Sequence, residues 1–123
     1  MVSRRVLSRA QADYAMEHGE LDGGVTQAAP RVAVVLSQDW CPQWVAMDRY
    51  LDELVVAADE GRSDLVVYHL LYNRVEYFRE FLRFKEQVWR NALIPYVRYY
   101  RQGALLRESN FVSQQQFLRS LEP

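Results

Sequence analysis

The chain has 123 residues, of which 50% are hydrophobic and 25% are charged. This balance is typical of one globular domain and excludes a disordered chain. Fifteen basic and sixteen acidic residues leave a formal net charge of −1. A charge so close to zero disfavours binding to nucleic acid or to an anionic membrane through bulk charge.

The chain has too few cysteines and histidines for a disulfide or a zinc site. Cys41 is the single cysteine, and His18 and His69 are the two histidines. We therefore expect no intrachain disulfide and no metal.

The sequence predicts neither a membrane span nor a secretory signal. The longest apolar run, residues 65–72, contains a histidine and is shorter than the ~18 residues that a spanning helix needs. The first acidic residue is Asp13, which weakly favours a transit peptide, but no apolar core follows the N-terminal arginines. We expect a cytoplasmic protein.

The N-terminal half is predicted to alternate helices and strands. Apolar residues at four-residue spacing predict a helix over residues 3–18. Residues 21–30 are predicted to be a loop or a short irregular strand. The continuous apolar run 31–37 predicts a strand buried on both faces. A helix should then start at Pro42 and stop at Gly61.

The next elements are predicted to be a strand over residues 64–72 and a helix that continues to about Arg90. Asn73 and Glu76 have the spacing of a capping box at the start of that helix.

A hairpin and a helix should complete the chain. Strands are predicted over residues 96–100 and 104–107, joined by a turn in which Gly103 supplies a positive φ. Ser113 and Gln116 predict a capping box at the start of the last helix.

Cys41 is the candidate nucleophile, because it stands between a predicted strand and the helix that begins at Pro42. Unpaired N–H groups and the partial positive charge of a helix N-terminus favour a thiolate over a thiol. This argument requires a partly exposed sulfur. The alternative is a buried, inert cysteine that fills space.

Two segments resemble the thioredoxin family. Residues 32–44, with Trp40-Cys41-Pro42 after a hydrophobic strand, resemble the strand and Trp-Cys-x-x-Cys motif of its active site. Residues 94–103 resemble the strand that begins with a cis-proline. The resemblance implies an α/β fold, a thioredoxin-like mixed sheet of four or five strands flanked by helices, with an extra N-terminal helix.

The resemblance also implies a division of the chain and a docking site. Residues 1–30 would pack on a thioredoxin-like domain of residues 31–123. In the family, an extended substrate segment pairs with the backbone before the cis-proline, which implies docking at Ile94 and Pro95. Trp40 and Pro42 would lie beside that substrate. The alternative for Pro95 is an ordinary trans proline at the start of a strand.

The sequence departs from the family at the second cysteine, where Trp44 stands instead. A dithiol cycle within one chain is therefore excluded, and what remains is monothiol exchange, resolved by glutathione or a partner thiol, or no redox chemistry. Trp44 itself could contact the substrate or shield the thiol, although its helical spacing favours a core position.

A second departure is Val35, where thioredoxins often have a buried aspartate. His69, in the next predicted strand, could act instead as a proton acceptor or as a positive neighbour of the thiolate. The alternative is a hydrogen-bonded core histidine.

The helix over residues 75–90 carries surplus aromatic side chains. They could form a patch for a partner or for a homodimer, or they could cover the sheet. Arg98, in a predicted covered strand, requires either an exposed face or a carboxylate partner.

Two functions remain open from the sequence. The first is monothiol thiol–disulfide exchange or redox sensing through Cys41. The second is a redox-inactive thioredoxin-fold module that binds a protein, or assembles with one, through the same groove.

Overall fold

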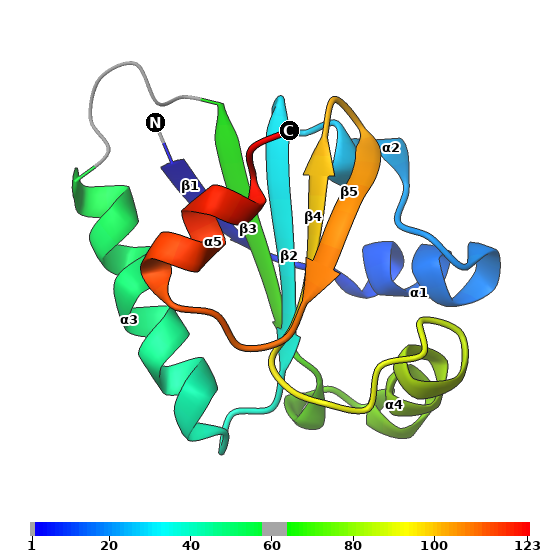
Figure 1. Cartoon of the computed structure of the whole chain (residues 1–123). Helices are drawn as coiled ribbons and strands as arrows, with labels where there is room; N and C mark the ends of the chain where they lie inside the picture. The colour runs from blue at the N-terminus through cyan, green and yellow to red at the C-terminus, as the bar shows by residue number, and fades with distance from the viewer. Residues whose placement is uncertain (1, 58–63) are drawn as a thin grey trace.

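A computed structural model describes residues 2–57 and 64–123, which form a mixed sheet between two layers of helices (Figure 1). In chain order the elements are β1 (Val2–Val6), α1 (Arg9–His18), α2 (Gly23–Thr26), β2 (Arg31–Ser37), α3 (Pro42–Ala57), β3 (Leu65–Leu71), the 3-10 turn η1 (Tyr72–Arg74), α4 (Phe78–Gln87), β4 (Tyr96–Arg101), β5 (Ala104–Ser109) and α5 (Gln114–Ser120). The strand order is β1-β3-β2-β4-β5. β1, β3 and β2 are parallel, whereas β4 is antiparallel to β2 and to β5. The predicted sheet of four or five strands flanked by helices is confirmed.

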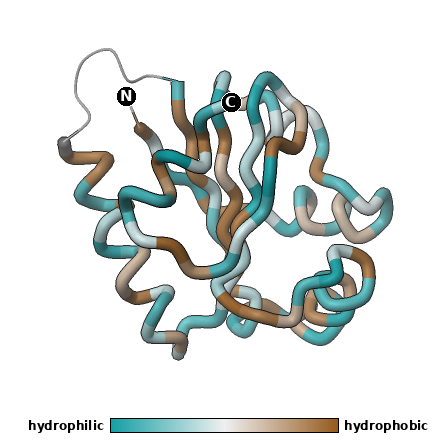
Figure 2. The backbone as a smooth tube through the Cα atoms, in the orientation of Figure 1, coloured by the Kyte–Doolittle hydropathy of each residue, from teal (hydrophilic) through white to brown (hydrophobic). Residues whose placement is uncertain are grey.

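Strand β2 is the centre of the molecule, because it pairs with β3 on one side and with β4 on the other. Its residues from Val32 to Leu36 have no exposed surface. Helices α1, α2 and α4 cover one face of the sheet, and α3 and α5 cover the other (Figure 1). Figure 2 shows the hydrophobic residues concentrated in these central strands. The continuous apolar pattern therefore predicted this strand correctly.

The predicted helix over residues 3–18 is wrong in its first part. Residues from Val2 to Val6 form the edge strand β1, which pairs with β3 along its whole length. Ser8 then caps α1 in a capping box with Gln11. The sheet edge satisfies the backbone groups of β1, and this long-range pairing overrides the local helical spacing. The segment 21–30 also differs, since it contains the short helix α2, capped by Asp22.

The predicted helix start at Asn73 is also wrong. Residues Tyr72–Arg74 form η1, and α4 runs from Phe78 to Gln87, without a side-chain cap at its N-terminus. The Asn73 side chain is hydrogen-bonded to Asp39 instead. Because this tertiary contact uses the side-chain amide, Asn73 does not cap a helix. The predicted stop of α3 at Gly61 lies outside the described residues.

Most aromatic side chains of the α4 region are buried within the chain, and Phe78 is partly buried. Those with at most 7% exposure are Tyr77, Phe81, Phe84 and Trp89. They pack in the apolar cluster on the α1 and α4 face of the sheet. Homodimerisation through residues 75–90 stays a prediction.

Arg98 has the carboxylate partner that the sequence could not identify. Its guanidinium donates to Glu20 at 2.7 Å and to the hydroxyls of Tyr96 and Tyr100, both at 2.8 Å. It also lies 4.2 Å from the centre of the Trp89 ring. A buried charge is tolerated here because its donors are satisfied.

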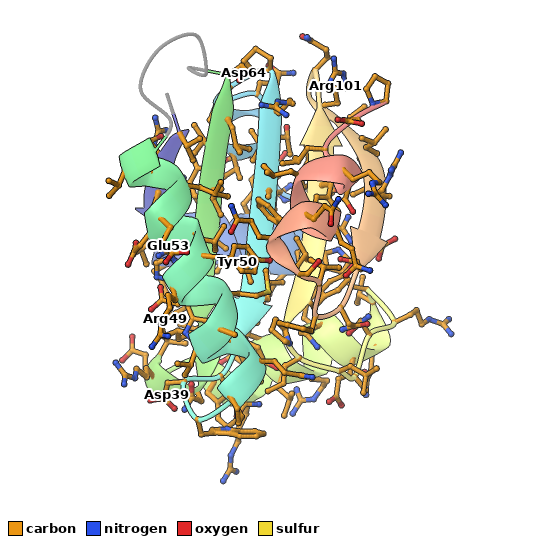
Figure 3. The ribbon with its side chains drawn as sticks, turned by 60° about the vertical axis from the view of Figure 1, so that its left-hand side comes forward. Asp39, Arg49, Tyr50, Glu53, Asp64 and Arg101 are labelled. Atoms are coloured by element: carbon orange, nitrogen blue, oxygen red, sulfur yellow. The ribbon has the colours of Figure 1, made fainter. Side chains whose placement is uncertain are left out.

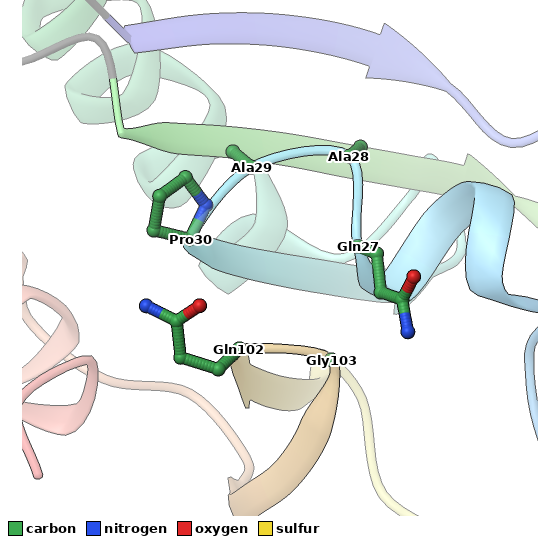
Figure 4. Close-up of a pocket in the computed structure, with 6 residues that line it drawn as sticks. All are labelled: Gln27, Ala28, Ala29, Pro30, Gln102 and Gly103. Atoms are coloured by element: carbon green, nitrogen blue, oxygen red, sulfur yellow. The ribbon is translucent and has the colours of Figure 1, made fainter.

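A hollow of about 430 Å³ lies at the sheet end where β2 begins (Figure 4). Residues Gln27 to Pro30 line one side, and the β4–β5 turn lines the other. The turn places Gly103 at φ +83°, as predicted, and a Cβ atom there would lie 2.8 Å from the Gln27 side chain. Only glycine fits this position without strain.

We expect Gly103→Ala to lower the free energy of unfolding by about 1–2 kcal/mol, the cost of left-handed backbone for a residue with a Cβ. Gly23→Ala is the matched control, because a Cβ there meets only ordinary contacts at 3.7 Å. This change should be neutral or stabilise by about 0.4–1 kcal/mol. Urea unfolding of both variants measures the difference, and an equal effect at the two positions would contradict the strain argument.

Candidate functional site

The candidate site lies where β2 ends and α3 begins. Figure 3 shows Asp39 at this end of the molecule, opposite to Asp64 and Arg101. The Asp39 backbone N–H donates to the Asn73 side chain at 2.9 Å, and the Asn73 amide donates back to the Asp39 carboxylate at 2.7 Å. Hydrogen bonds from Asn73 and Arg74 lower the pKa of Asp39. The loop before Cys41 is thus fixed to the residues that follow β3.

Helix α3 is held against α5 by Tyr50, which lies between the two helices (Figure 3). Its hydroxyl donates to the Val112 carbonyl at 2.9 Å, and its ring packs against Phe117. Burial raises the pKa of Tyr50, so this hydroxyl stays a proton donor. The contact fixes the helix that directly follows Cys41.

Cys41 is a free, buried cysteine with 4% of its surface exposed. Its N–H donates to the Gln38 carbonyl, and its own carbonyl accepts from Val45 in the first turn of α3. The side chain packs in the apolar cluster that also contains Trp44 and Met47. The exposure on which the predicted reactivity depends is therefore very small.

Trp40 and Pro42, which flank Cys41, are exposed, whereas Trp44 is buried. Trp40 is 64% exposed, and its indole N–H donates to the Gln38 side chain at 2.7 Å. Pro42 is exposed at the start of α3. Trp44 is 5% exposed and is a core residue in this structure. Of these three side chains, only Trp40 and Pro42 are accessible to a partner.

The peptide bond between Ile94 and Pro95 is cis. Tyr96 pairs with Leu36 near the end of β2, which brings this bond to the sheet end at which Cys41 lies. Ile94 packs against the same apolar cluster as Cys41. The fold therefore brings together two segments about fifty residues apart in the sequence.

Two side chains beside this bond, those of Leu93 and Phe111, were not identified from the sequence. Leu93 is 65% exposed, and Phe111, in the loop after β5, is 40% exposed. Within the described residues, the backbone N–H and carbonyl of Ile94 make no hydrogen bond. Only the tertiary structure shows that the two loops meet: the Asn110 side chain donates to the Pro95 carbonyl at 3.0 Å.

His69 lies on β3 opposite Val35, as a neighbour of Trp44 and Arg4. Its Nδ1 is 3.4 Å from an Arg4 nitrogen, and no hydrogen bond joins it to Cys41. Burial, together with the charge of Arg4, lowers the pKa of His69. A neutral imidazole supplies no positive charge, so His69 does not stabilise a thiolate at Cys41 in the way that the sequence suggested.

Neither a metal site nor a membrane-spanning helix is found in the described part of the chain. It contains no group of three or more His, Cys, Asp or Glu side chains placed to hold a metal ion. None of its helices combines the length and apolar character of a membrane span.

We expect the stability to fall as the pH drops below about 6.5, the ordinary pKa of histidine. The lowered pKa of His69 means that the unfolded chain takes up a proton before the folded chain does, so acid favours unfolding. Asp48 and Asp52, which bind Arg4 at 2.7 and 2.8 Å, oppose this shift only in part. His69→Gln should reduce the loss of unfolding free energy between about pH 7.5 and 5.5. His18→Gln, at an exposed position, is the control and should keep it.

We expect the Cys41 thiol to react with iodoacetamide much more slowly in the folded protein than in urea, because its side chain is buried. Mass spectrometry of timed samples measures the rate. Equal rates in the folded and unfolded chain would mean that the sulfur is accessible.

No protein-family model and no curated protein sequence matches this chain. Solved structures do match over nearly its whole length. Trxlp from Edwardsiella tarda is 22% identical with a TM-score of 0.59, covering 94% of this chain and 93% of its own. Oxidised thioredoxin O1 from Arabidopsis thaliana is 11% identical with a TM-score of 0.64, covering 95% and 92%. Thioredoxin F from spinach chloroplast is 13% identical with a TM-score of 0.61, covering 98% and 89%. This chain therefore has a thioredoxin-like fold, with its single cysteine directly before α3.

Proposed function

We propose that this chain is a redox-inactive thioredoxin-fold module that binds an extended, apolar segment of a partner protein. The observation that carries the proposal is a contrast at one end of the sheet. Cys41 is buried, whereas Trp40 and Leu93, on the two loops at this end of the sheet, are about two-thirds exposed. The site offers a partner a surface to bind but little access to a thiol.

We call this surface the docking edge. It consists of the side chains of Trp40, Val45, Leu93 and Phe111 together with the backbone of Ile94. Figure 1 places the loops before α3, before β4 and before α5 at the same end of the sheet. Exposed apolar side chains that gather at one place are typical of a protein-binding surface, and aromatic residues dominate the energy of such surfaces.

The partner segment should be extended because of the backbone that the docking edge presents. The N–H and carbonyl of Ile94 are free of hydrogen bonds within the described residues. One donor and one acceptor on an irregular segment beside a strand suit pairing with another extended chain. Main-chain pairing would supply the orientation, while Trp40 and Leu93 would select apolar side chains.

The docking edge is built on fixed loops. Asn73 and Arg74 bind Asp39 beside Trp40, and Asn110 binds the Pro95 carbonyl beside Ile94. A surface that is already ordered loses less conformational entropy when it binds. This order favours recognition of one kind of segment over loose hydrophobic contact.

Monothiol exchange is the second candidate, and the position of Cys41 favours it. The thiol is free, lies directly before α3 and shares an apolar cluster with Ile94. If the sulfur becomes accessible, its thiolate can attack a disulfide in a bound segment, which forms a mixed disulfide and releases the other sulfur of that disulfide as a thiolate. Because the sequence has no second cysteine, release would then need glutathione or a partner thiol.

Selection of a peptide library on the whole protein tests the docking edge. We expect the selected peptides to carry aromatic or branched apolar residues and to shift the NMR signals of the Ile94 amide and the Trp40 indole. Trp40→Ala and Leu93→Ser should each weaken a selected peptide about tenfold or more, the loss that central apolar contacts cause. Val56→Ala is the matched control, because Val56 is 85% exposed near the far end of α3. Peptides that bind without shifting Ile94 would contradict the proposal.

Incubation with oxidised glutathione separates the two candidates. We expect no mixed disulfide on the folded protein, because Cys41 is buried. Mass spectrometry detects the adduct directly, and Cys41→Ser should leave binding of the selected peptide unchanged. Rapid glutathionylation of the folded chain, with loss of binding in Cys41→Ser, would favour monothiol exchange instead.

A further inference from the structure

Lys85 is a buried cation that neither the sheet nor Cys41 requires. It is the only lysine of the chain, and its surface is 0% exposed. A lysine is almost never buried without partners for its ammonium group. Here the Nζ atom donates to the backbone carbonyls of Asn91 and Leu93, both at 2.8 Å.

These two carbonyls belong to the segment that leads from α4 into the docking edge. Leu93 is an exposed member of that surface, and Ile94 follows it directly. The Asn91 N–H also donates to the Lys85 carbonyl at 3.2 Å. Lys85 therefore holds the segment through both its side chain and its backbone.

The other side of the same segment is held by two asparagines. Asn91 Oδ1 accepts from the Leu93 N–H at 3.1 Å and from the Asn110 amide at 3.0 Å. Asn110 also donates to the Pro95 carbonyl. Every bond in this network involves the segment 91–95, so Lys85 and Asn110 both hold it in place.

The surroundings of Lys85 are nearly apolar. The titratable groups that face it are Glu86, next along α4, and Tyr96 on β4, whose ring centre is 5.5 Å from Nζ. Burial lowers the pKa of Lys85 to about 8, and the charge of Glu86 opposes this only in part. The ammonium form is thus present at neutral pH and is lost just above it.

We propose that Lys85 is a positioning residue for the docking edge. Its ammonium group binds the carbonyls of Asn91 and Leu93 and thereby holds Leu93 and Ile94 in the arrangement that receives a partner segment. The inference rests on the proposed binding function, which it deepens by giving the surface a charged support inside the fold. Hydrogen bonds from an ammonium group are stronger than those from a neutral amine, so loss of the proton should loosen the segment.

A titration of the unmodified protein tests this without any substitution. Growth with ¹³C-lysine gives one lysine signal, because Lys85 is the only lysine. We expect that signal to titrate near pH 8, and the amide signals of Asn91 and Leu93 to move with the same midpoint. A lysine that titrates while both amides stay still would overturn the proposal.

Two variants test the link to binding, with the peptide selected on the docking edge as the probe. Lys85→Met should weaken that peptide about tenfold at neutral pH and abolish the titration of the Leu93 amide. The wild-type protein should lose affinity for the peptide above about pH 8, where Lys85 loses its proton. Lys85→Arg keeps the charge and should not show this loss. Arg83→Met is the control, since it removes a positive charge from the exposed side of the same helix.

The outcomes separate this proposal from the binding function itself. If the peptide contacts Ile94 in the wild type and binds Lys85→Met equally well, the positioning role is wrong and the docking edge stands. If the peptide never contacts Ile94, the docking edge is wrong, whatever the lysine titration shows. Urea unfolding of Lys85→Met identifies a general loss of structure, in which case the wild-type titration decides.

Discussion

The complete burial of β2 is the constraint on which the rest of the structure depends. Its side chains from Val32 to Leu36 have no exposed surface, and helices cover both faces of the sheet. A strand enclosed in this way cannot present a reactive group along its length, because a polar group there would lack partners. Chemistry or recognition can appear only where the strand ends. Cys41 and the cis bond before Pro95 both lie at that end.

The polar groups inside the fold are used to hold segments in place. Arg98 connects β4 to Glu20 after α1, and Asn73 connects the end of β3 to Asp39. Each of these groups is satisfied by specific partners, as buried polar groups must be. Arg4 differs, because its Nε atom is buried and has no partner within the described residues.

The same end of the sheet combines a buried sulfur with exposed aromatic and aliphatic side chains. In a dithiol enzyme, one thiol attacks and the other releases the product. This chain has Trp44 in the second position, and that side chain fills the core beside Met47. The loss of the second cysteine therefore adds apolar packing under the site. This packing is consistent with the proposed binding surface and not with a dithiol cycle.

The sequence by itself determined the elements whose signals are local or strongly periodic. The continuous apolar run predicted β2, Pro42 predicted the start of α3, and Ser113 with Gln116 predicted the cap of α5. The resemblance to thioredoxins added the mixed sheet flanked by helices and the placement of the Ile94–Pro95 segment beside Cys41.

Only the tertiary structure decided the features that depend on contacts between distant residues. Residues from Val2 to Val6 form a strand because β3 offers an open edge, and Asn73 does not cap a helix because Asp39 binds it. The exposure of Cys41 and the partners of Lys85 are likewise set by which segments pack around them. Local sequence encodes backbone preference and periodicity, but burial and long-range hydrogen bonds exist only once the chain has closed on itself.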